Sequence, residues 1–193
     1  MRDNFLLKLY KIPQTVFSLS ELCLFFPTTP YNNLKRRLNY YVLSGSLLHL
    51  RKAIYAKEGF NPLEIPGKIY TPSYISLETV LAFEGVIFQA DSTISCVSYL
   101  SRRISVADTP IVYRQIKSSV LTNPQGVETK NGYSTATKER AFLDALFLFR
   151  NYYFDNLNGL NWSKVLNLQK IYKNRELEKR VSDYWRMLKK DYA

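Results

Sequence analysis

The sequence predicts an α+β protein in two parts. Residues 1–60 form a basic helical domain ending in a β-hairpin, and residues 61–193 form a mostly helical α+β domain with a small sheet. Three observations predict this organisation. Helix-start signals precede apolar residues at helical spacing in the first part, and two short β-prone runs follow them. Two prolines and two glycines then fall between residues 58 and 67, where we expect the domain boundary.

Charge is unevenly distributed along the chain. In total, 27 Lys and Arg residues stand against 16 Asp and Glu residues. Residues 1–60 hold nine cations and three acids, residues 61–150 hold nine and eight, and residues 151–193 hold nine and five. No carboxylate occurs between Glu21 and Glu58. We therefore expect the first part to meet a polyanion, although a solvated basic surface has the same pattern.

Two short helices are predicted first. One covers about residues 4–11 and ends before Pro13. The second begins at Ser18, which forms a capping box with Glu21, while Phe17 and Leu22 match the hydrophobic staple around that cap. This helix is expected to end before Pro27.

The third helix is predicted from Thr29, its expected cap, with Pro30 at the first helical position, to Leu43, with Gly45 as terminator. At 100° per residue the apolar residues share one side of this helix. That apolar side consists of Tyr31, Leu34, Leu38, Tyr41 and Val42.

The opposite side of the third helix suits DNA bases. Asn pairs in bidentate fashion with adenine and Arg with guanine, while flanking cations meet phosphates. Lys35 and Arg37 flank this side and are the predicted phosphate contacts. A basic helix that faces only solvent remains the alternative. The predicted base-reading residues are Asn32, Asn33, Arg36, Asn39 and Tyr40.

Two β-prone runs, at residues 47–50 and 53–56, bracket Arg51 and Lys52. Three helices followed by a hairpin with a cationic tip form the winged helix-turn-helix layout, so Arg51 and Lys52 are predicted to contact the DNA backbone or minor groove. Because Arg-Lys is a poor pair for a tight turn that needs positive φ, we expect a tip wider than two residues. His49 on the wing strand is expected to pack or to bind a phosphate.

Four helices and two strands are predicted after residue 60. The first helix is capped by Ser73 or Ser76, has an apolar face that includes Phe83, and ends at Gly85. Two strands are expected near residues 94–100 and 111–116. Three further helices are expected at about residues 135–150, 162–172 and 175–190.

Three segments resemble the AbiEi family, the antitoxins of type IV abortive-infection toxin–antitoxin pairs. They are the wing at residues 50–56, a helix start that reads Ser-Tyr-Ile-Ser-Leu-Glu at residues 73–78, and a helix with Glu-Arg-Ala-Phe-Leu-Asp at residues 139–144. The chain departs from the family pattern at Ala53, where family wings usually have Gly. In this helix Arg140 and Asp144 lie four residues apart and are expected to form an intrahelical pair.

The resemblance implies a function. It implies that the winged helix binds double-stranded DNA at inverted repeats in its own promoter and represses the operon. It also implies that the second domain counters a nucleotidyltransferase-like toxin, with or without a stable complex. Two alternatives remain: a stand-alone regulator with a ligand- or partner-sensing second domain, and a scaffold whose basic surface meets an acidic protein.

Catalytic and metal motifs are not apparent in the sequence. The seven glycines are scattered, and Cys23, Cys96 and His49 do not form a metal-binding pattern. We therefore expect no enzyme activity, catalytic residue, metal or cofactor, and two buried free thiols. The first residues lack the apolar core of a signal peptide, and no apolar stretch is long enough to span a bilayer, so a cytoplasmic protein without a membrane partner is expected.

Overall fold

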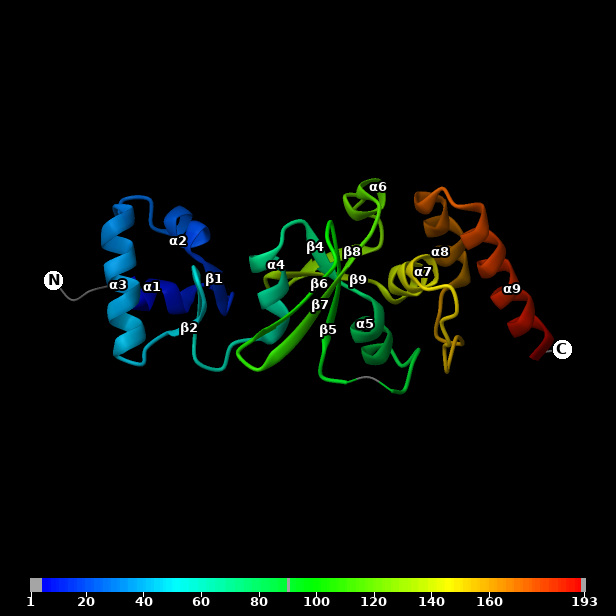
Figure 1. Cartoon of the computed structure of the whole chain (residues 1–193), viewed down its shortest axis with the longest axis horizontal. Helices are drawn as coiled ribbons and strands as arrows, with labels where there is room; N and C mark the ends of the chain where they lie inside the picture. Colours follow the sequence, from blue (N-terminus) through cyan, green and yellow to red (C-terminus); the bar gives the residue numbers. More distant parts are fainter. Residues whose placement is uncertain (1–4, 90, 192–193) are drawn as a thin grey trace.

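The computed structural model describes residues 5–89 and 91–191. It confirms an α+β protein with two sheets. The molecule is elongated: the N-terminal helices lie at one end of the long axis, the larger sheet lies in the middle, and the C-terminal helices lie at the other end (Figure 1). None of the helices in these described ranges is long and apolar enough to cross a membrane.

The first part combines three helices with a three-stranded antiparallel sheet in the order β1-β3-β2. This arrangement is that of a winged helix, as predicted, but the short strand β1 was not predicted. The elements are α1 (Phe5–Lys11), β1 (Val16–Ser18), α2 (Leu19–Phe25), α3 (Tyr31–Leu43), β2 (Leu48–Arg51) and β3 (Ile54–Ala56).

The predicted capping box of α2 is confirmed. The Ser18 side chain accepts a hydrogen bond from the Glu21 N–H, and the Glu21 carboxylate accepts one from the Ser18 N–H in return. The predicted cap of α3 is wrong. Pro30 rather than Thr29 occupies the N-cap position, and no side chain caps the helix. Gly45 follows α3 with a φ of 74°, as its role of terminator requires.

Leu34 and Leu38 hold α3 in the core of the first part. Both are fully buried, and Tyr41 is buried beside them against α1, its ring 5.6 Å from that of Phe5. Tyr31 is different: the sequence placed it on the apolar side, but its side chain is 54% exposed. Tyr31 is the first residue of the helix, so its side chain lies outside the core that contains Leu34 and Leu38.

The second part contains a six-stranded mixed sheet in the order β6-β7-β5-β4-β9-β8. This sheet is larger than the small sheet that the sequence predicted. Its strands are β4 (Ser73–Ile75), β5 (Ile94–Ser98), β6 (Arg102–Val106), β7 (Thr109–Gln115), β8 (Val127–Lys130) and β9 (Tyr133–Ala136). Of the two residues predicted to start the first helix of this part, Ser76 is the N-cap of α5 (Leu77–Phe83), whereas Ser73 lies in a strand. Thr135, the predicted start of the next helix, also lies in a strand.

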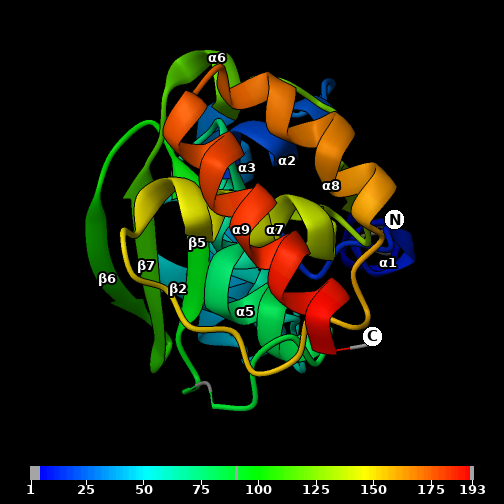
Figure 2. The ribbon, with the colours of Figure 1, turned by 90° about the vertical axis from the view of Figure 1, so that its right-hand side faces the viewer.

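Helices cover the two faces of this sheet unequally. A short helix, α4 (Ile65–Ile69), lies on the side of the winged helix, whereas α5 (Leu77–Phe83), α7 (Lys138–Leu148), α8 (Trp162–Leu168) and α9 (Arg175–Asp191) lie on the other side (Figures 1 and 2). Strands β6 and β7 extend beyond these four helices (Figure 2). The helical segments are η1 (Pro62–Glu64), α4 (Ile65–Ile69), α5 (Leu77–Phe83), α6 (Ser118–Leu121), α7 (Lys138–Leu148), α8 (Trp162–Leu168), η2 (Gln169–Tyr172) and α9 (Arg175–Asp191).

Two side-chain expectations for the second part have different outcomes. Phe83 was expected on the apolar face of α5, but its side chain is 74% exposed because it ends the helix. The cysteines are both free; Cys96 is buried as predicted, while Cys23 is only partly buried.

The expected domain boundary at residue 60 falls in the connection between β3 and η1, and the two parts are bonded across it. The buried Glu64 carboxylate accepts hydrogen bonds from the N–H groups of Thr15 and Val16, at 2.8 and 2.9 Å, and from the Thr15 hydroxyl at 2.7 Å. Lys68 in α4 forms an ion pair with Glu21 in α2. These bonds tie η1 (Pro62–Glu64) and α4 (Ile65–Ile69), which precede the larger sheet, to the winged helix.

Candidate nucleic-acid interface

The face of α3 opposite its buried leucines is open to solvent. This helix lies at the end of the long axis that is farthest from the C-terminal helices (Figure 1). All five predicted base-reading residues are exposed on it. The helix buries only Leu34, Leu38 and Tyr41. The face therefore presents three amides, a guanidinium and a phenol, which are the groups that read base edges in a major groove.

The two flanking cations lie on opposite borders of this face. The Lys35 ammonium lies 5.7 Å from the centre of the Tyr31 ring, and the Arg37 guanidinium lies 6.0 Å from the Phe5 ring of α1. Both side chains are exposed. They thus stand where the phosphates on either side of a groove would pass.

The N-terminus of α3 opens onto a hollow. Thr28, Thr29, Asn33, Arg36 and Arg37 line it. The first N–H groups of a helix have no partner within the helix, and here no side chain caps them. Uncapped N–H groups beside two guanidiniums favour an anion at this position.

The wing tip carries both predicted cations. Arg51 ends β2, Lys52 and Ala53 form the turn, and the side chains of Arg51 and Lys52 are exposed. The turn needs positive φ only at Ala53, where φ is 63°. The pairing of β2 with β3 shifts register between His49 and Arg51, which accommodates the Arg-Lys pair. The expectation of a tip wider than two residues is wrong: the tip is a two-residue turn with an irregular register next to it.

A second hollow separates the wing from the start of α3. Its walls include Tyr31, Arg51 and Lys52 of the winged helix, and Lys68 and Tyr70 from α4 and its end. Sequence reasoning assigned neither Tyr31 nor Lys68 to this surface. Tyr31 was missed because periodicity alone does not show that a first-turn residue lies outside the core. Lys68 was missed because it reaches this surface only through the packing of α4.

Glu21 forms an ion pair with Lys68, which lines this hollow. Burial tends to raise the pKa of the Glu21 carboxyl, but hydrogen bonds from Lys68 and Ser18 outweigh burial and lower the pKa. Glu21 is therefore ionised and paired at neutral pH. Its charge does not oppose a polyanion that approaches α3 and the wing.

Leu43 is a further residue that sequence reasoning left out of the site. It ends α3 on the same side as Arg36, and its side chain is 88% exposed. Apolar side chains are among the groups by which DNA-binding helices contact thymine methyl groups in a major groove. The signal for it is its position on the helical wheel, 180° from Leu34.

The centre of the His49 ring lies 5.2 Å from that of the Tyr55 ring on the neighbouring strand. Within residues 5–89 and 91–191, no group of three or more His, Cys, Asp and Glu side chains is placed to hold a metal ion.

Comparison of the sequence with models of protein families and with curated proteins found no match.

Proposed function

We propose that the protein is a DNA-binding transcriptional repressor that binds double-stranded DNA through α3 and the wing. The observation that carries the proposal is the exposed face of α3, which is polar and free of carboxylates and is bordered by Lys35, Arg37, Arg51 and Lys52. A helix with this chemistry fits a major groove, and the wing cations reach the adjacent backbone.

The resemblance to AbiEi antitoxins adds the identity of the regulated DNA and of the second activity. On this basis we propose that the protein represses its own promoter at inverted repeats and counters a nucleotidyltransferase-like toxin. A regulator of DNA works beside the chromosome, so we propose a cytoplasmic location. The alternative is a stand-alone regulator whose second part senses a ligand or a partner, without a toxin.

The DNA-binding proposal is tested by fluorescence anisotropy with labelled DNA from upstream of the gene. We expect this DNA to bind at least a thousandfold more tightly than a scrambled duplex of equal length, on the order of the ratio typical of specific binding. Equal affinity for both duplexes would contradict it.

The antitoxin proposal is tested separately by growth. The gene immediately downstream is expressed alone and together with this chain. We expect arrest in the first case and growth in the second, and growth with the isolated downstream gene would favour the stand-alone regulator. A variant with impaired DNA binding, such as Arg36→Ala, separates repression from toxin neutralisation.

A further inference from the structure

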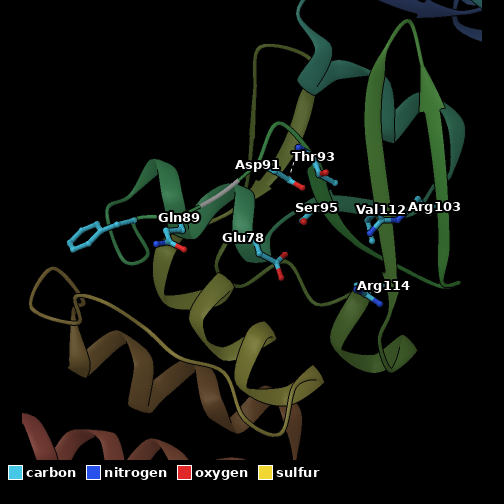
Figure 3. Close-up of a pocket in the computed structure, with 9 residues that line it drawn as sticks. Glu78, Gln89, Asp91, Thr93, Ser95, Arg103, Val112 and Arg114 are labelled. Carbon is cyan, nitrogen blue, oxygen red and sulfur yellow. Dashed lines mark hydrogen bonds between the residues drawn. The ribbon is translucent and has the colours of Figure 1, made fainter.

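A hollow of about 570 Å³ lies on the larger sheet, away from the winged helix (Figure 3). Its floor comes from three neighbouring strands. Ser95 of β5 lies beside Val112 of β7, and Val112 lies opposite Arg103 of β6. Residues directly opposite on adjacent strands share one face of a sheet, and Arg114, two residues after Val112, shares that face too. Two arginines therefore line the same hollow.

The Arg114 guanidinium is oriented without using its donors. It lies 5.6 Å from the centre of the Phe149 ring. Among the residues that the structure describes, its N–H groups have no hydrogen-bond or ion-pair partner. Stacking on an aromatic ring holds the plane of a guanidinium and leaves its N–H edge free for an anion.

The opposite wall carries acids. Glu78 of α5 lines the hollow across from Arg114, and in the described part of the chain these two side chains form no ion pair. Asp91 also lines the hollow, where its carboxylate accepts a hydrogen bond from the Thr93 N–H at 2.8 Å. Hydrogen bonds from Thr93, and then the charge of Arg103, hold the pKa of Asp91 below its usual value.

Opposite charges thus line one hollow, and among the described residues its acids and its arginines form no ion pair with each other. The space between them suits a ligand with an anionic end and a hydrogen-donating end. Two guanidiniums offer more N–H donors than one carboxylate accepts, whereas a phosphate group can accept from both. The two carboxylates would repel a continuous DNA backbone, so a single phosphate group fits better.

We propose that this hollow binds a small phosphate ester of ribose, such as a nucleoside monophosphate. Its phosphate lies against Arg103 and Arg114, and its ribose hydroxyls donate to Glu78. A carboxylate that accepts from ribose hydroxyls is a common feature of nucleotide sites. The volume lies within the range of small-molecule sites and exceeds that needed for a bare ion. This site is independent of DNA binding by α3.

The test is isothermal titration calorimetry of the full chain, without DNA, against AMP, ribose 5-phosphate, inorganic phosphate and L-glutamate. We expect AMP and ribose 5-phosphate to bind with dissociation constants in the micromolar to millimolar range. Arg114→Ala should weaken both by about tenfold or more, because it removes charge-assisted hydrogen bonds. Glu78→Gln should weaken ribose 5-phosphate and leave inorganic phosphate unchanged.

The matched control is Arg102→Ala. Arg102 is an exposed arginine next to Arg103 but points to the opposite face of β6, so its removal should leave binding unchanged. Arg36→Ala should also bind AMP normally, which separates this proposal from the DNA-binding one. If thermal unfolding shows that Arg114→Ala does not fold, Arg103→Ala replaces it. The proposal is overturned by no AMP binding at millimolar concentration, by equal losses in Arg102→Ala and Arg114→Ala, or by tighter binding of L-glutamate than of ribose 5-phosphate.

Discussion

Arg140 and Asp144 form an ion pair that is completely buried. The Arg140 Nε lies 3.5 Å from the Asp144 Oδ1, and neither side chain is exposed to solvent. The Tyr172 hydroxyl donates to Asp144 at 2.6 Å, and the Ser76 hydroxyl donates at 2.8 Å. Burial, and then the Asp144 carboxylate, raise the pKa of Tyr172 well above 10, so this hydroxyl remains a donor. The pair links α7 to η2 and to the start of α5.

Removing one partner of this pair should strongly destabilise the protein. Asp144→Ala leaves the buried Arg140 guanidinium without its counter-charge, and we expect it to lower the free energy of unfolding by about 3–5 kcal/mol. Asp183→Ala is the matched control, because Asp183 pairs with Arg186 in α9 with both side chains more than half exposed. It should cost about 1 kcal/mol or less. Urea unfolding measures both, and equal costs would contradict the structural role of the buried pair.

Arg36→Ala tests base recognition. We expect a loss of about 1–3 kcal/mol of binding free energy on the cognate site and a relaxed sequence preference, because Arg36 lies in the middle of the exposed face of α3. Anisotropy titrations with cognate and scrambled DNA measure this, with Arg102→Ala as a control at a distant arginine. If cognate and scrambled DNA lose affinity equally, Arg36 does not read bases.

Lys52→Ala tests the contact of the wing with phosphates. The salt dependence of binding reports the number of phosphates neutralised, so the slope of log K against log salt should fall by about one for every DNA sequence. Lys179→Ala, an exposed lysine in α9, should leave the slope unchanged. An unchanged slope in Lys52→Ala would remove the wing tip from the interface. Lys35, Arg37 and Arg51 are tested in the same way.

The Glu21–Lys68 pair should make stability depend on pH. The pKa of Glu21 is lower in the folded chain than its usual 4.5, so the pair stabilises the fold at neutral pH and this stability is lost as the pH falls through the folded value. Because Glu21 is one-third exposed, we expect about 1 kcal/mol or less. The free energies of unfolding of the wild type and Glu21→Gln should differ at neutral pH and converge as the pH falls through the lowered pKa of Glu21. A constant difference would contradict this assignment.

Ala53→Gly should stabilise the wing. Ala53 adopts a φ of 63°. This backbone conformation costs an L-residue about 1 kcal/mol of conformational free energy, whereas glycine adopts it without that cost. We expect a comparable gain in the free energy of unfolding, measured in urea. Ala56→Gly is the control: Ala56 is fully buried in β3, so glycine there should destabilise. Destabilisation by Ala53→Gly would show that the methyl group is needed at the tip.

Local signals predicted the winged helix well. The capping box at Ser18 and the terminator at Gly45 depend only on neighbours within a few residues, so the sequence contains all the information that they need. Strand β1 lacks such a signal. Its three residues form a strand only because they pair with β3, about 40 residues further along the chain. The same holds for β4, which is stabilised by partners on both sides.

The chemistry of the second part was harder to predict. The spacing of Arg140 and Asp144 predicted their pairing, and the structure confirms it. Their burial depends on Tyr74 and Tyr172, which come from distant segments, and periodicity does not reveal such partners. No sequence motif marks Arg103 and Arg114 as a site, because only the pairing of β6 with β7 brings them to one face.

The three bonds that Glu64 accepts have a mechanical consequence. They join the winged helix to the segment that leads into the larger sheet, and α3 and α9 lie at opposite ends of the long axis (Figure 1). If the protein binds DNA as proposed and the two parts move together, a small tilt of α3 in a groove would displace α9 by a larger distance. DNA sites that differ in groove shape would therefore place the C-terminal helices of two bound copies at different separations.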